Sequence, residues 1–366
     1  MKKEINIVGA GISGLTAAIN LAKAGFKVRV FEKNDTVGKR FSGDYQGIEN
    51  WVYDQDALEH LKNLNLEINF PYYLVKEVNI IGPDRKIHHY KFEKSLVYLV
   101  KRGTKEDTLD QALLKQAQRV GAEIIFNSEK NHLEFGDIIA RGYFPDKVTD
   151  GIVVGYNFKT DVKDQYWGIL DNNVAPVGYA YCLCTNGKIT LAVCIFKDFS
   201  KNKEYLEKAY NIFQKIIGFQ AEDKIFFAGI SDSLISDFLW SKTAVFKGRL
   251  YVGETAGFID NLWGFGIKYA MISGYLAAKS IIGSKDYDKL WKEYILPQLK
   301  ASLVNRFYCN LLNNKIYQMI LEKLENSKHP INFLKKTYNY SLIHRIGFPF
   351  ARLFLRKNIK DPRKFK

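Results

Sequence analysis

The sequence predicts an α/β protein with three parts: a parallel-sheet domain, an inserted and mostly antiparallel β-sheet domain, and a C-terminal helical region. Three observations favour this fold class. A glycine-rich turn at residues 9–14 lies between two apolar runs, a second glycine-rich stretch covers residues 252–267, and a basic segment with helical apolar spacing follows residue 301. The chain has 366 residues, 47% of them hydrophobic, which suffices for two folded domains and excludes a disordered protein.

The N-terminal glycine-rich turn is typical of a dinucleotide site. An apolar run at residues 5–8 leads into Gly9, Gly11 and Gly14, a helix-like stretch follows, and a second apolar run ends at Glu32. In this pattern the first glycine permits a tight turn, the second lets a pyrophosphate approach the backbone, and the third lets the helix pack closely. Glu32 lies 18 residues after Gly14, where an acid meets ribose hydroxyls. The alternatives are a glycine turn without a ligand and a secretory signal peptide.

The second glycine-rich stretch, VGETAGFIDNLWGFGI, follows a short apolar run and precedes a helix predicted at residues 267–282. A flavin dinucleotide extends beyond one βαβ unit, so a second loop is needed to hold its ribityl chain and ring. We expect Glu254 to accept hydrogen bonds from sugar hydroxyls. The helix that opens after Gly264 and Gly266 would add a positive dipole near the flavin ring or the pyrophosphate.

Together, VGAGISGLTAAINLAKAGFKVRVFEK and GETAGFIDNLWGFGIKYAMISGYLAA resemble the geranylgeranyl reductase family of flavoproteins, which share the larger fold of aromatic hydroxylases. Residues 99–124 and 176–184 extend the resemblance, which covers roughly residues 1–300. It implies a Rossmann-type FAD-binding domain with an inserted mostly antiparallel β-sheet substrate domain and a C-terminal helical region. We assign residues 1–60, 100–145 and 245–300 to the FAD-binding domain, 61–99 and 146–244 to the substrate domain, and 301–366 to the basic helical region.

The motifs predict a set of FAD-binding residues. Arg102 matches an arginine that contacts FAD in the family, and Arg40, in VGKRFS, resembles the glycine-arginine element of amine oxidases and carotenoid desaturases. The full set is Gly9, Gly11, Ser13, Gly14, Glu32, Lys33, Arg40, Ser42, Gly43, Arg102, Gly253, Glu254, Gly264, Gly266 and Ile267.

The sequence departs from the family at several positions. Glu254 stands where the family usually has Asp, and Asn261 where it has Pro. The Asp-Gly pair expected after the middle strand is Arg141-Gly142 here, which disfavours direct NADPH use, although Asp150-Gly151 follows nine residues later. The electron donor therefore stays open between NADPH and ferredoxin.

The resemblance implies hydride transfer from reduced FAD to a C=C bond of a polyprenyl lipid, with a proton added to the neighbouring carbon. Candidates for the proton donor are Asp44, Tyr45 and Glu49, because a carboxyl group in an apolar cavity has a raised pKa. Alternatively, Asp44 is a turn residue and Glu49 a solvated surface charge. Tyr179 and Trp263 are predicted to line the substrate cavity, although aromatic residues at strand spacing often only pack.

The cysteines are predicted to be reduced core residues of a cytosolic protein. Asn186-Gly187 predicts a hairpin in which Cys184 lies opposite Ile189 and Cys182 opposite Leu191. The histidines show no metal-ligand spacing, so we predict no metal site.

The formal net charge of +15 is concentrated at the C-terminus. Residues 301–366 contain 14 Lys and Arg against 3 acids, which gives +11 of the total. Residues 341–366 mix large apolar side chains with cations, as in an interfacial helix on anionic lipid. The alternative is that the apolar residues cover the body of the protein. We expect no nucleic-acid partner, because no binding module accompanies the charge.

These observations leave three functions open. The first is an FAD-dependent reductase of polyprenyl lipids, cytoplasmic and peripheral on the inner face of the membrane. The second is an FAD-dependent oxidase, desaturase or monooxygenase acting on an apolar substrate. The third is a membrane-docked flavoprotein that relays electrons to a partner protein.

Overall fold

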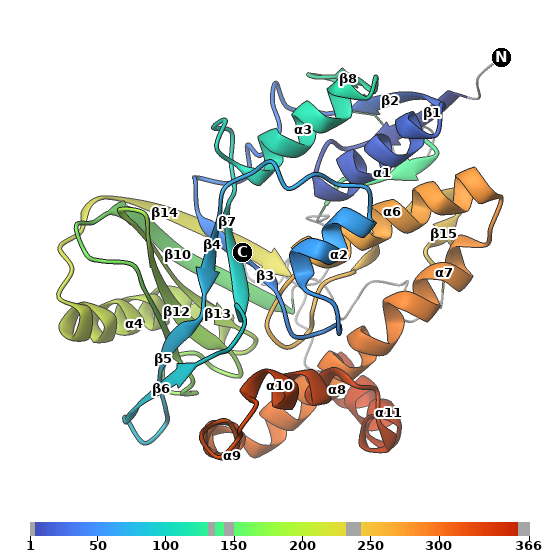
Figure 1. The fold of residues 1–366 in the computed structure, drawn as a ribbon. Coiled ribbons are helices and arrows are strands. Elements are labelled where there is room, and N and C mark those ends of the chain that lie inside the picture. The colour runs from blue at the N-terminus through green and yellow to red at the C-terminus, as the bar shows by residue number, and fades with distance from the viewer. Residues whose placement is uncertain (1–3, 131–135, 143–149, 232–242, 358–366) are drawn as a thin grey trace.

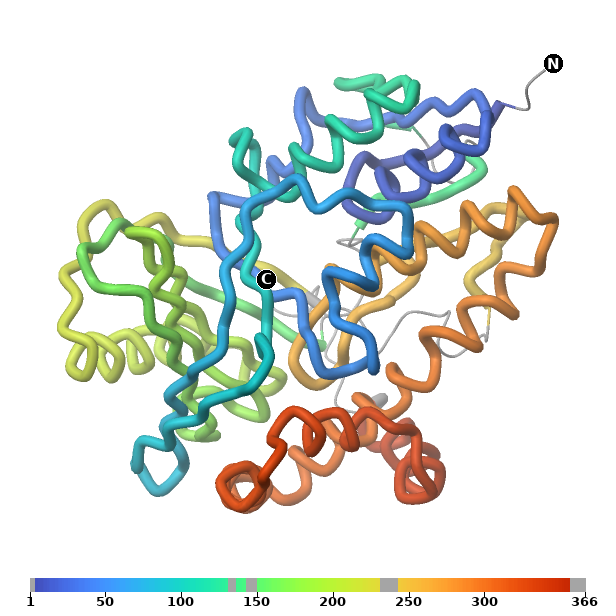
Figure 2. The backbone as a smooth tube through the Cα atoms, in the orientation of Figure 1, coloured from blue at the N-terminus to red at the C-terminus, as the bar shows by residue number. Residues whose placement is uncertain are grey.

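The computed structural model describes residues 4–130, 136–142, 150–231 and 243–357, with side chains of the last helix described as far as Leu355. Figure 1 shows three groups of elements. The parallel sheet with α1 and α3 lies at the top, the larger sheet with α4 at the left, and the C-terminal helices along the bottom. Figure 2 traces the chain through these groups and shows that each of the two sheets draws on segments far apart in the sequence.

A six-stranded sheet forms the core of the first part, in the order β15-β16-β9-β1-β2-β8. Every neighbouring pair is parallel except β15 and β16. Its strands are β1 (Glu4–Val8), β2 (Lys27–Phe31), β8 (Glu123–Ile125), β9 (Ile138–Ile139), β15 (Val245–Phe246) and β16 (Arg249–Tyr251). The central strands are rich in Val and Ile because helices cover a parallel sheet on its faces.

Two helices from opposite ends of the sequence pack together beside this sheet. They are α1 (Ile12–Lys23), which is buried from Ile12 to Leu21, and α6 (Ile267–Gly283). At Gly274 in α6, a Cβ atom would lie only 2.2 Å from the carbonyl oxygen of Ser13, so glycine permits this close approach. The helix α3 (Leu109–Arg119) packs against the other side of α1.

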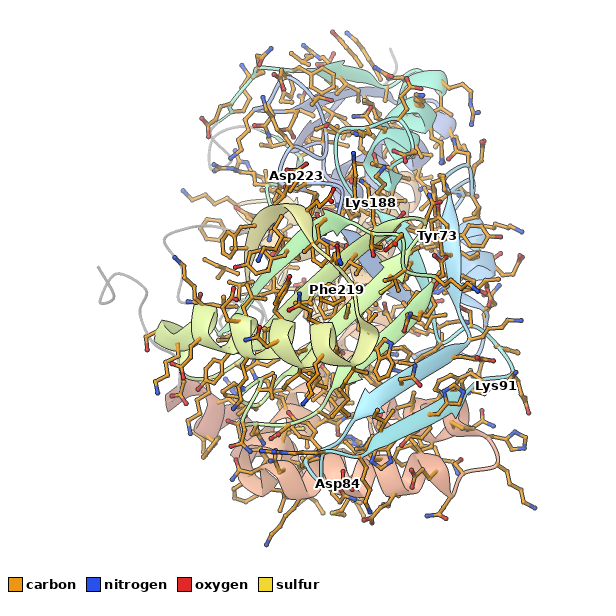
Figure 3. The ribbon with its side chains drawn as sticks, turned by 90° about the vertical axis from the view of Figure 1, so that its left-hand side faces the viewer. Tyr73, Asp84, Lys91, Lys188, Phe219 and Asp223 are labelled. Atoms are coloured by element: carbon orange, nitrogen blue, oxygen red, sulfur yellow. The ribbon has the colours of Figure 1, made fainter. Side chains whose placement is uncertain are left out.

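A seven-stranded sheet forms the second part, in the order β14-β10-β13-β12-β11-β5-β6. It is antiparallel except between β11 and β5. Its strands are β5 (Glu77–Ile81), β6 (Ile87–Lys91), β10 (Gly151–Lys159), β11 (Gln165–Ile169), β12 (Tyr179–Thr185), β13 (Lys188–Ile195) and β14 (Glu222–Ser231). Figure 3 shows the outer face of this sheet, crossed by α4 (Asn202–Ile217), with Phe219 buried at the layer between them.

The predicted hairpin register is confirmed. Cys182 pairs with Leu191 and Cys184 with Ile189 across β12 and β13. All four cysteines are buried and free, as predicted, and Cys182 and Cys184 belong to the core under α4. The neighbouring tyrosines of β12 point to the opposite face, toward the first part of the molecule.

A small third sheet joins the two larger ones. It consists of β3 (Tyr45–Glu49), β7 (Val97–Lys101) and β4 (Tyr72–Val75), with β7 in the centre. The backbone N–H of Tyr45 donates to Thr190 Oγ1 at 3.0 Å, which links β3 to the seven-stranded sheet. The short helix α2 (Ala57–Asn63) follows β3 and packs into the core of the first part. This sheet thus takes strands from both predicted domains, whose boundaries stay a prediction.

The C-terminal region is helical. It contains α7 (Tyr287–Tyr294), α8 (Leu296–Leu312), α9 (Asn314–Glu325), α10 (Pro330–Tyr338) and α11 (Leu342–Lys357). The helix α8 is fixed to the body by Arg306, which is buried, donates to the backbone oxygen of Asp150 at 2.5 Å and stacks on Phe196. Within the described ranges, no helix is both long and apolar enough to cross a bilayer.

Candidate flavin site

The first glycine loop has the geometry of a phosphate cradle. Gly9 has a φ of +103°, and a Cβ there would lie 2.3 Å from the oxygen of Ala140. At Gly14 a Cβ would lie 2.1 Å from the oxygen of Gly9, so the helix packs directly on the turn. Around Gly11, by contrast, no atom lies within 4 Å of an added Cβ. The backbone at Gly11 is therefore open to a ligand. Packing within the protein does not explain why this position is a glycine.

The N-terminus of α1 faces this opening without a side-chain cap. Its N-cap residue is Gly11, and its first turn contains no acid. The unpaired backbone N–H groups and the helix dipole therefore favour an anion. Ser13, in the same turn, is buried against the second glycine stretch.

Glu32 holds its carboxylate beside the glycine loop. One oxygen accepts the backbone N–H of Ala10 at 2.9 Å, and the other accepts the N–H of Asn34 at 3.0 Å. The carboxylate is fixed at the end of β2, where an acceptor for sugar hydroxyls is expected. Lys33 follows it and is exposed.

The second glycine stretch contacts the first. The short 3₁₀ turn η2 (Gly253–Ala256) follows β16, and the N–H of Gly253 donates to Ser273 Oγ at 2.8 Å. A Cβ at Gly253 would lie 2.6 Å from Ser13 Oγ. The segment that the sequence places some 240 residues downstream therefore lies directly against the first turn of α1.

An ion pair connects the loop after β2 to the second glycine stretch. Arg40 Nη1 lies 2.7 Å from Glu254 Oε2, although 214 positions separate the two residues in sequence. Both are predicted FAD-binding residues, and their pairing is a contact that the sequence does not reveal. The loop continues through Ser42, whose N–H donates to Asp44 Oδ1 at 3.2 Å, and Gly43, which has a φ of +85°.

The position of the missing Asp-Gly pair also lies here. The N–H of Gly142 donates to Thr255 Oγ1 at 2.8 Å, and the side chain of Arg141 reaches Glu129. Asp150 lies elsewhere, in the buried ion pair with Arg306. The later Asp-Gly pair is therefore engaged with the C-terminal helices instead of with the glycine stretches.

A tight loop delivers the N-terminus of α6. Asp260 Oδ1 accepts the N–H groups of Leu262 at 2.9 Å and Trp263 at 2.5 Å, and the N–H of Asp260 donates to the oxygen of Phe265. The loop ends at Gly266, the N-cap of α6, which carries no side-chain cap, and the buried Ile267 begins the helix. Burial raises the pKa of Asp260 to about 6. Asp260 is not among the predicted site residues, although an aspartate that bonds the backbone N–H two residues later is typical of an Asx turn.

The guanidinium of Arg102 is hydrogen-bonded to other side chains of the protein. Its guanidinium makes two hydrogen bonds to the Asp110 carboxylate, at 2.8 and 2.9 Å, and a third to Gln46 at 2.9 Å. It also stacks over the ring of Phe41. Arg102 thus supports β3 through Gln46, and its contact with FAD stays a prediction.

The three candidate proton donors do not converge on one point. Asp44 precedes β3 and Glu49 ends it, and a strand rises about 3.3 Å per residue, so the two carboxylates lie far apart. Asp44 is buried, and Gln46 Nε2 donates to it at 2.8 Å. Burial raises the pKa of Asp44. Tyr45 is buried and meets the ring of Tyr73 edge to face.

Glu49 is not a surface charge, and that alternative is wrong. Its side chain is 2% exposed and pairs with Lys268, whose Nζ lies 3.4 Å from the carboxylate. Burial raises the pKa of Glu49 and lowers that of Lys268. Sequence reasoning missed Lys268, because a lysine in an otherwise apolar helix gives no indication of its partner.

The two predicted cavity residues come together. The hydroxyl of Tyr179 on β12 donates to the backbone oxygen of Trp263, and their ring centroids lie 5.4 Å apart. Tyr181 continues this face of the sheet, 5.9 Å from Tyr179. Burial raises the pKa of both tyrosines, and the Asp44 carboxylate contributes to the shift at Tyr181. Asp44, the β12 tyrosines and the loop before α6 therefore belong to one region.

Comparisons with known proteins place the first segment in a broad class. Residues 7–55 match the model of the NAD(P)-binding Rossmann-like domain. Thiamine thiazole synthase of Thermotoga maritima is 40% identical over 81 residues, which cover 22% of this chain and 30% of that protein. The 1-hydroxycarotenoid 3,4-desaturase of a Flavobacterium is 33% identical over 138 residues, covering 36% and 25%. The chain thus matches less than a third of the length of these curated relatives.

Solved structures match over the whole chain. A geranylgeranyl bacteriochlorophyll reductase-like protein from Thermoplasma acidophilum has a TM-score of 0.69 at 18% identity, covering 98% of this chain and 100% of that one. A flavoprotein/dehydrogenase from Cytophaga hutchinsonii has a TM-score of 0.62 at 14% identity, covering 98% and 99%. The predicted fold class is confirmed, and the chain has the fold of FAD-dependent oxidoreductases that the sequence resemblance implied.

Proposed function

We propose that this oxidoreductase of the FAD-dependent fold saturates C=C bonds of a polyprenyl lipid. The observation that supports this most is the full-length likeness to a reductase-like structure, which includes both sheets and the C-terminal helices. Curated relatives named as carotenoid desaturases and hydroxysqualene dehydroxylases favour an isoprenoid substrate class, although they match only part of the chain.

The residues present fit FAD. The uncapped N-terminus of α1 and the open space at Gly11 suit the pyrophosphate, and Glu32 suits a ribose. The Arg40–Glu254 pair lies at the start of the second glycine stretch, and the uncapped N-terminus of α6 lies at its end. When bound, FAD would supply the hydride for the reduction.

The chain itself would supply the proton and a dry site. A double bond accepts a hydride at one carbon and a proton at the other, and an isolated alkene reacts only if the acid is close. Asp44 suits this role best among the three candidates, because it is buried beside the β12 tyrosines and burial raises its pKa. Glu49 is committed to Lys268. The aromatic face of Tyr179, Tyr181 and Trp263 would cover the apolar substrate.

A lipid substrate also calls for contact with a membrane. We propose that the basic C-terminal region provides it, since it contributes +11 of the net charge. The electron donor is either NADPH or a ferredoxin-type protein, and Arg141-Gly142 in place of Asp-Gly favours the protein donor.

The test uses anaerobic, flavin-loaded protein whose flavin has been photoreduced. Adding a geranylgeranyl lipid in detergent should reoxidise the flavin, and the product should gain two hydrogens for each bond reduced. A flavin that stays reduced with the lipid present would overturn the proposal. Free FAD that is photoreduced in the presence of the Gly11→Ala protein, which should not retain it, controls for reactions that do not need the site.

A second candidate is the reverse chemistry, desaturation or oxidation of an apolar substrate. The Arg40-containing loop favours it, because this element resembles that of carotenoid desaturases. When such an enzyme starts with oxidised flavin, a saturated lipid should reduce the flavin under anaerobic conditions, and the reduced flavin should then react rapidly with added oxygen. An electron relay would leave both lipids unchanged.

A further inference from the structure

The last helix, α11, is held against the body by one face. At Gly347 a Cβ would lie 2.9 Å from Val304 Cγ1, so α11 approaches α8 as closely as a glycine allows. Ala351 and Leu355 are buried against Leu303 and Val304. These buried contacts hold one face of α11 against α8.

A polar contact fixes the start of the same helix. His344 is buried, with Nε2 3.1 Å from Asn305 Oδ1 on α8 and Nδ1 2.9 Å from the hydroxyl of Ser341. Burial lowers the pKa of His344, so its ring stays neutral around neutral pH. The anchor of α11 therefore does not depend on a charge that titrates there.

A second face of α11, adjacent to the packed one, is apolar and exposed, and Phe354 at its edge also contacts Phe307 of α8. We define the α11 face by six side chains and their exposed fractions: Leu342 71%, Ile343 65%, Ile346 61%, Phe350 62%, Leu353 63% and Phe354 37%. At about 100° per residue these positions fall within an arc of about 120°. Single exposed apolar residues are ordinary on a protein surface, whereas a continuous row marks a binding surface. Figure 1 shows α11 at the lower edge of the molecule, beside α8.

Positive charge on α11 favours an anionic partner for this face. Arg345 is exposed and Arg352 is half-buried on the same helix, and Arg356 and Lys357 follow in the sequence. Between residues 326 and 360 the chain has eight Lys and Arg and no acid: Lys328, Lys335, Lys336, Arg345, Arg352, Arg356, Lys357 and Lys360. In a symmetric contact between two copies of the α11 face, Arg345 and Arg352 of each copy would lie near those of the other and repel. An anionic surface complements them.

We propose that the α11 face docks this protein on bilayers containing anionic lipids, with α11 lying in the plane of the interface. The row of Leu, Ile and Phe side chains would enter the headgroup boundary, and the flanking arginines would meet the lipid phosphates. Because α8 holds the helix in place before binding, docking would not require the helix to fold. The proposal rests on the proposed function for the source of the substrate, which must leave a bilayer to reach the site.

The experiment measures co-sedimentation of the flavin-loaded full chain with vesicles. One set contains phosphatidylcholine alone, and the other also contains phosphatidylglycerol. The docking variant is Ile346→Glu with Leu353→Glu. The matched control is Ile216→Glu with Ile225→Glu, which adds the same two charges at exposed isoleucines (39% and 52%) on α4 and β14, far from α11 in the sequence. Equal melting temperatures and circular dichroism spectra establish that all variants are folded.

We expect wild type and the control to bind anionic vesicles at least about tenfold more tightly than neutral ones, and added salt to weaken binding. The docking variant should lose about tenfold or more in affinity for the anionic vesicles. Equal binding by the docking variant would overturn the proposal, as would absence of binding by wild type. Light scattering that shows a dimer in wild type and a monomer in the docking variant would assign the face to a second copy instead.

The proposed function is tested separately. The docking variant should reoxidise its flavin with detergent-solubilised lipid as fast as wild type, because α11 contributes no residue to the candidate flavin site. If wild type fails in detergent but still binds vesicles, the reductase proposal is rejected and the docking proposal stands. If wild type turns over in detergent but binds no vesicles, the reverse holds.

Discussion

Lys268, in the first turn of α6, lies with its Nζ 3.4 Å from the carboxylate of Glu49 at the end of β3, and both side chains are buried. The same Nζ donates to the backbone oxygen of Glu49 at 2.9 Å and lies 4.8 Å from the ring centre of Tyr53. This pair ties the helix that follows the second glycine stretch to the strand that follows Asp44. It therefore sets the spacing between the loop before α6 and the candidate proton donor.

Lys268→Met should destabilise the protein by about 3–5 kcal/mol, because it leaves the Glu49 carboxylate buried without a cation. Adding Glu49→Gln should recover most of that loss, since the remaining side chain is neutral. Urea unfolding of wild type, both single variants and the double variant measures the coupling. Strictly additive losses would show that the two side chains do not act as a pair.

Asp260 should make stability depend on pH in a defined window. Its folded pKa, about 6, lies above its ordinary value of 3.8, so the folded protein holds the proton more tightly. The stabilisation is complete below about pH 4 and is lost as pH rises to 6, with a total on the order of 2–3 kcal/mol. Asp260→Asn keeps the hydrogen-bond acceptor and should remove this slope. Unfolding free energies of both proteins from pH 4 to 7 provide the comparison, and parallel curves would contradict the assignment.

Gly11→Ala and Gly14→Ala should distinguish a loss of FAD affinity from a loss of folding stability. The added methyl at Gly14 would meet a backbone oxygen at 2.1 Å, so that variant should lose both stability and FAD. At Gly11 no protein atom is near, so the variant should keep its melting temperature and still lose FAD affinity. Gly168→Ala, where the nearest atoms lie at 3.8 Å in the other sheet, serves as the control. Retention of FAD by Gly11→Ala would show that the pyrophosphate does not approach this turn.

Arg40→Ala should weaken FAD binding about tenfold or more, since it removes the cation that links the loop after β2 to the second glycine stretch. Arg40 is about half exposed, so the cost in folding stability should stay below about 1 kcal/mol. Lys39→Ala removes the same charge from a neighbouring pair with Asp35 and is the matched control. Fluorescence titration of the flavin-free proteins gives the dissociation constants, and equal values for both variants would exclude a role for Arg40.

Asp44→Asn should lower lipid turnover by about 10²- to 10⁴-fold if its proton is used in the reaction. Because burial raises the pKa of Asp44, wild-type turnover should fall as pH rises through that pKa, and the variant should lose this limb. FAD affinity and photoreduction should not change. Full turnover in both Asp44→Asn and Glu49→Gln would exclude the carboxylates as donors.

The sequence predicted the elements whose determinants are local. The βαβ unit follows from glycine spacing between two apolar runs, and the register of Cys182 and Cys184 follows from a two-residue turn signal. Tyr179 and Trp263 were predicted to line the same cavity, but their direct contact was not predicted. The resemblance to a family supplied that link, since strand spacing alone does not distinguish a cavity wall from packing.

The partners in three long-range charge pairs could not be predicted. Arg40 with Glu254, Glu49 with Lys268 and Asp150 with Arg306 each join residues more than 150 positions apart. Nothing in the neighbourhood of either partner encodes such a contact. The small sheet was missed for a related reason, because its strands come from segments assigned to different domains.

The order of strands in the six-stranded sheet has a consequence for synthesis of the chain. Strand β1 is made first. Its neighbour β9 is translated after β5 and β6, and the next strand, β16, only after every strand of the second sheet has been translated. Until α6 leaves the ribosome, the apolar surface of α1 that it covers has no partner. The parallel-sheet part is therefore incomplete during translation, and its exposed hydrophobic surface can bind chaperones or aggregate. Its folding should be slow, because the contacts that complete it join segments distant in sequence.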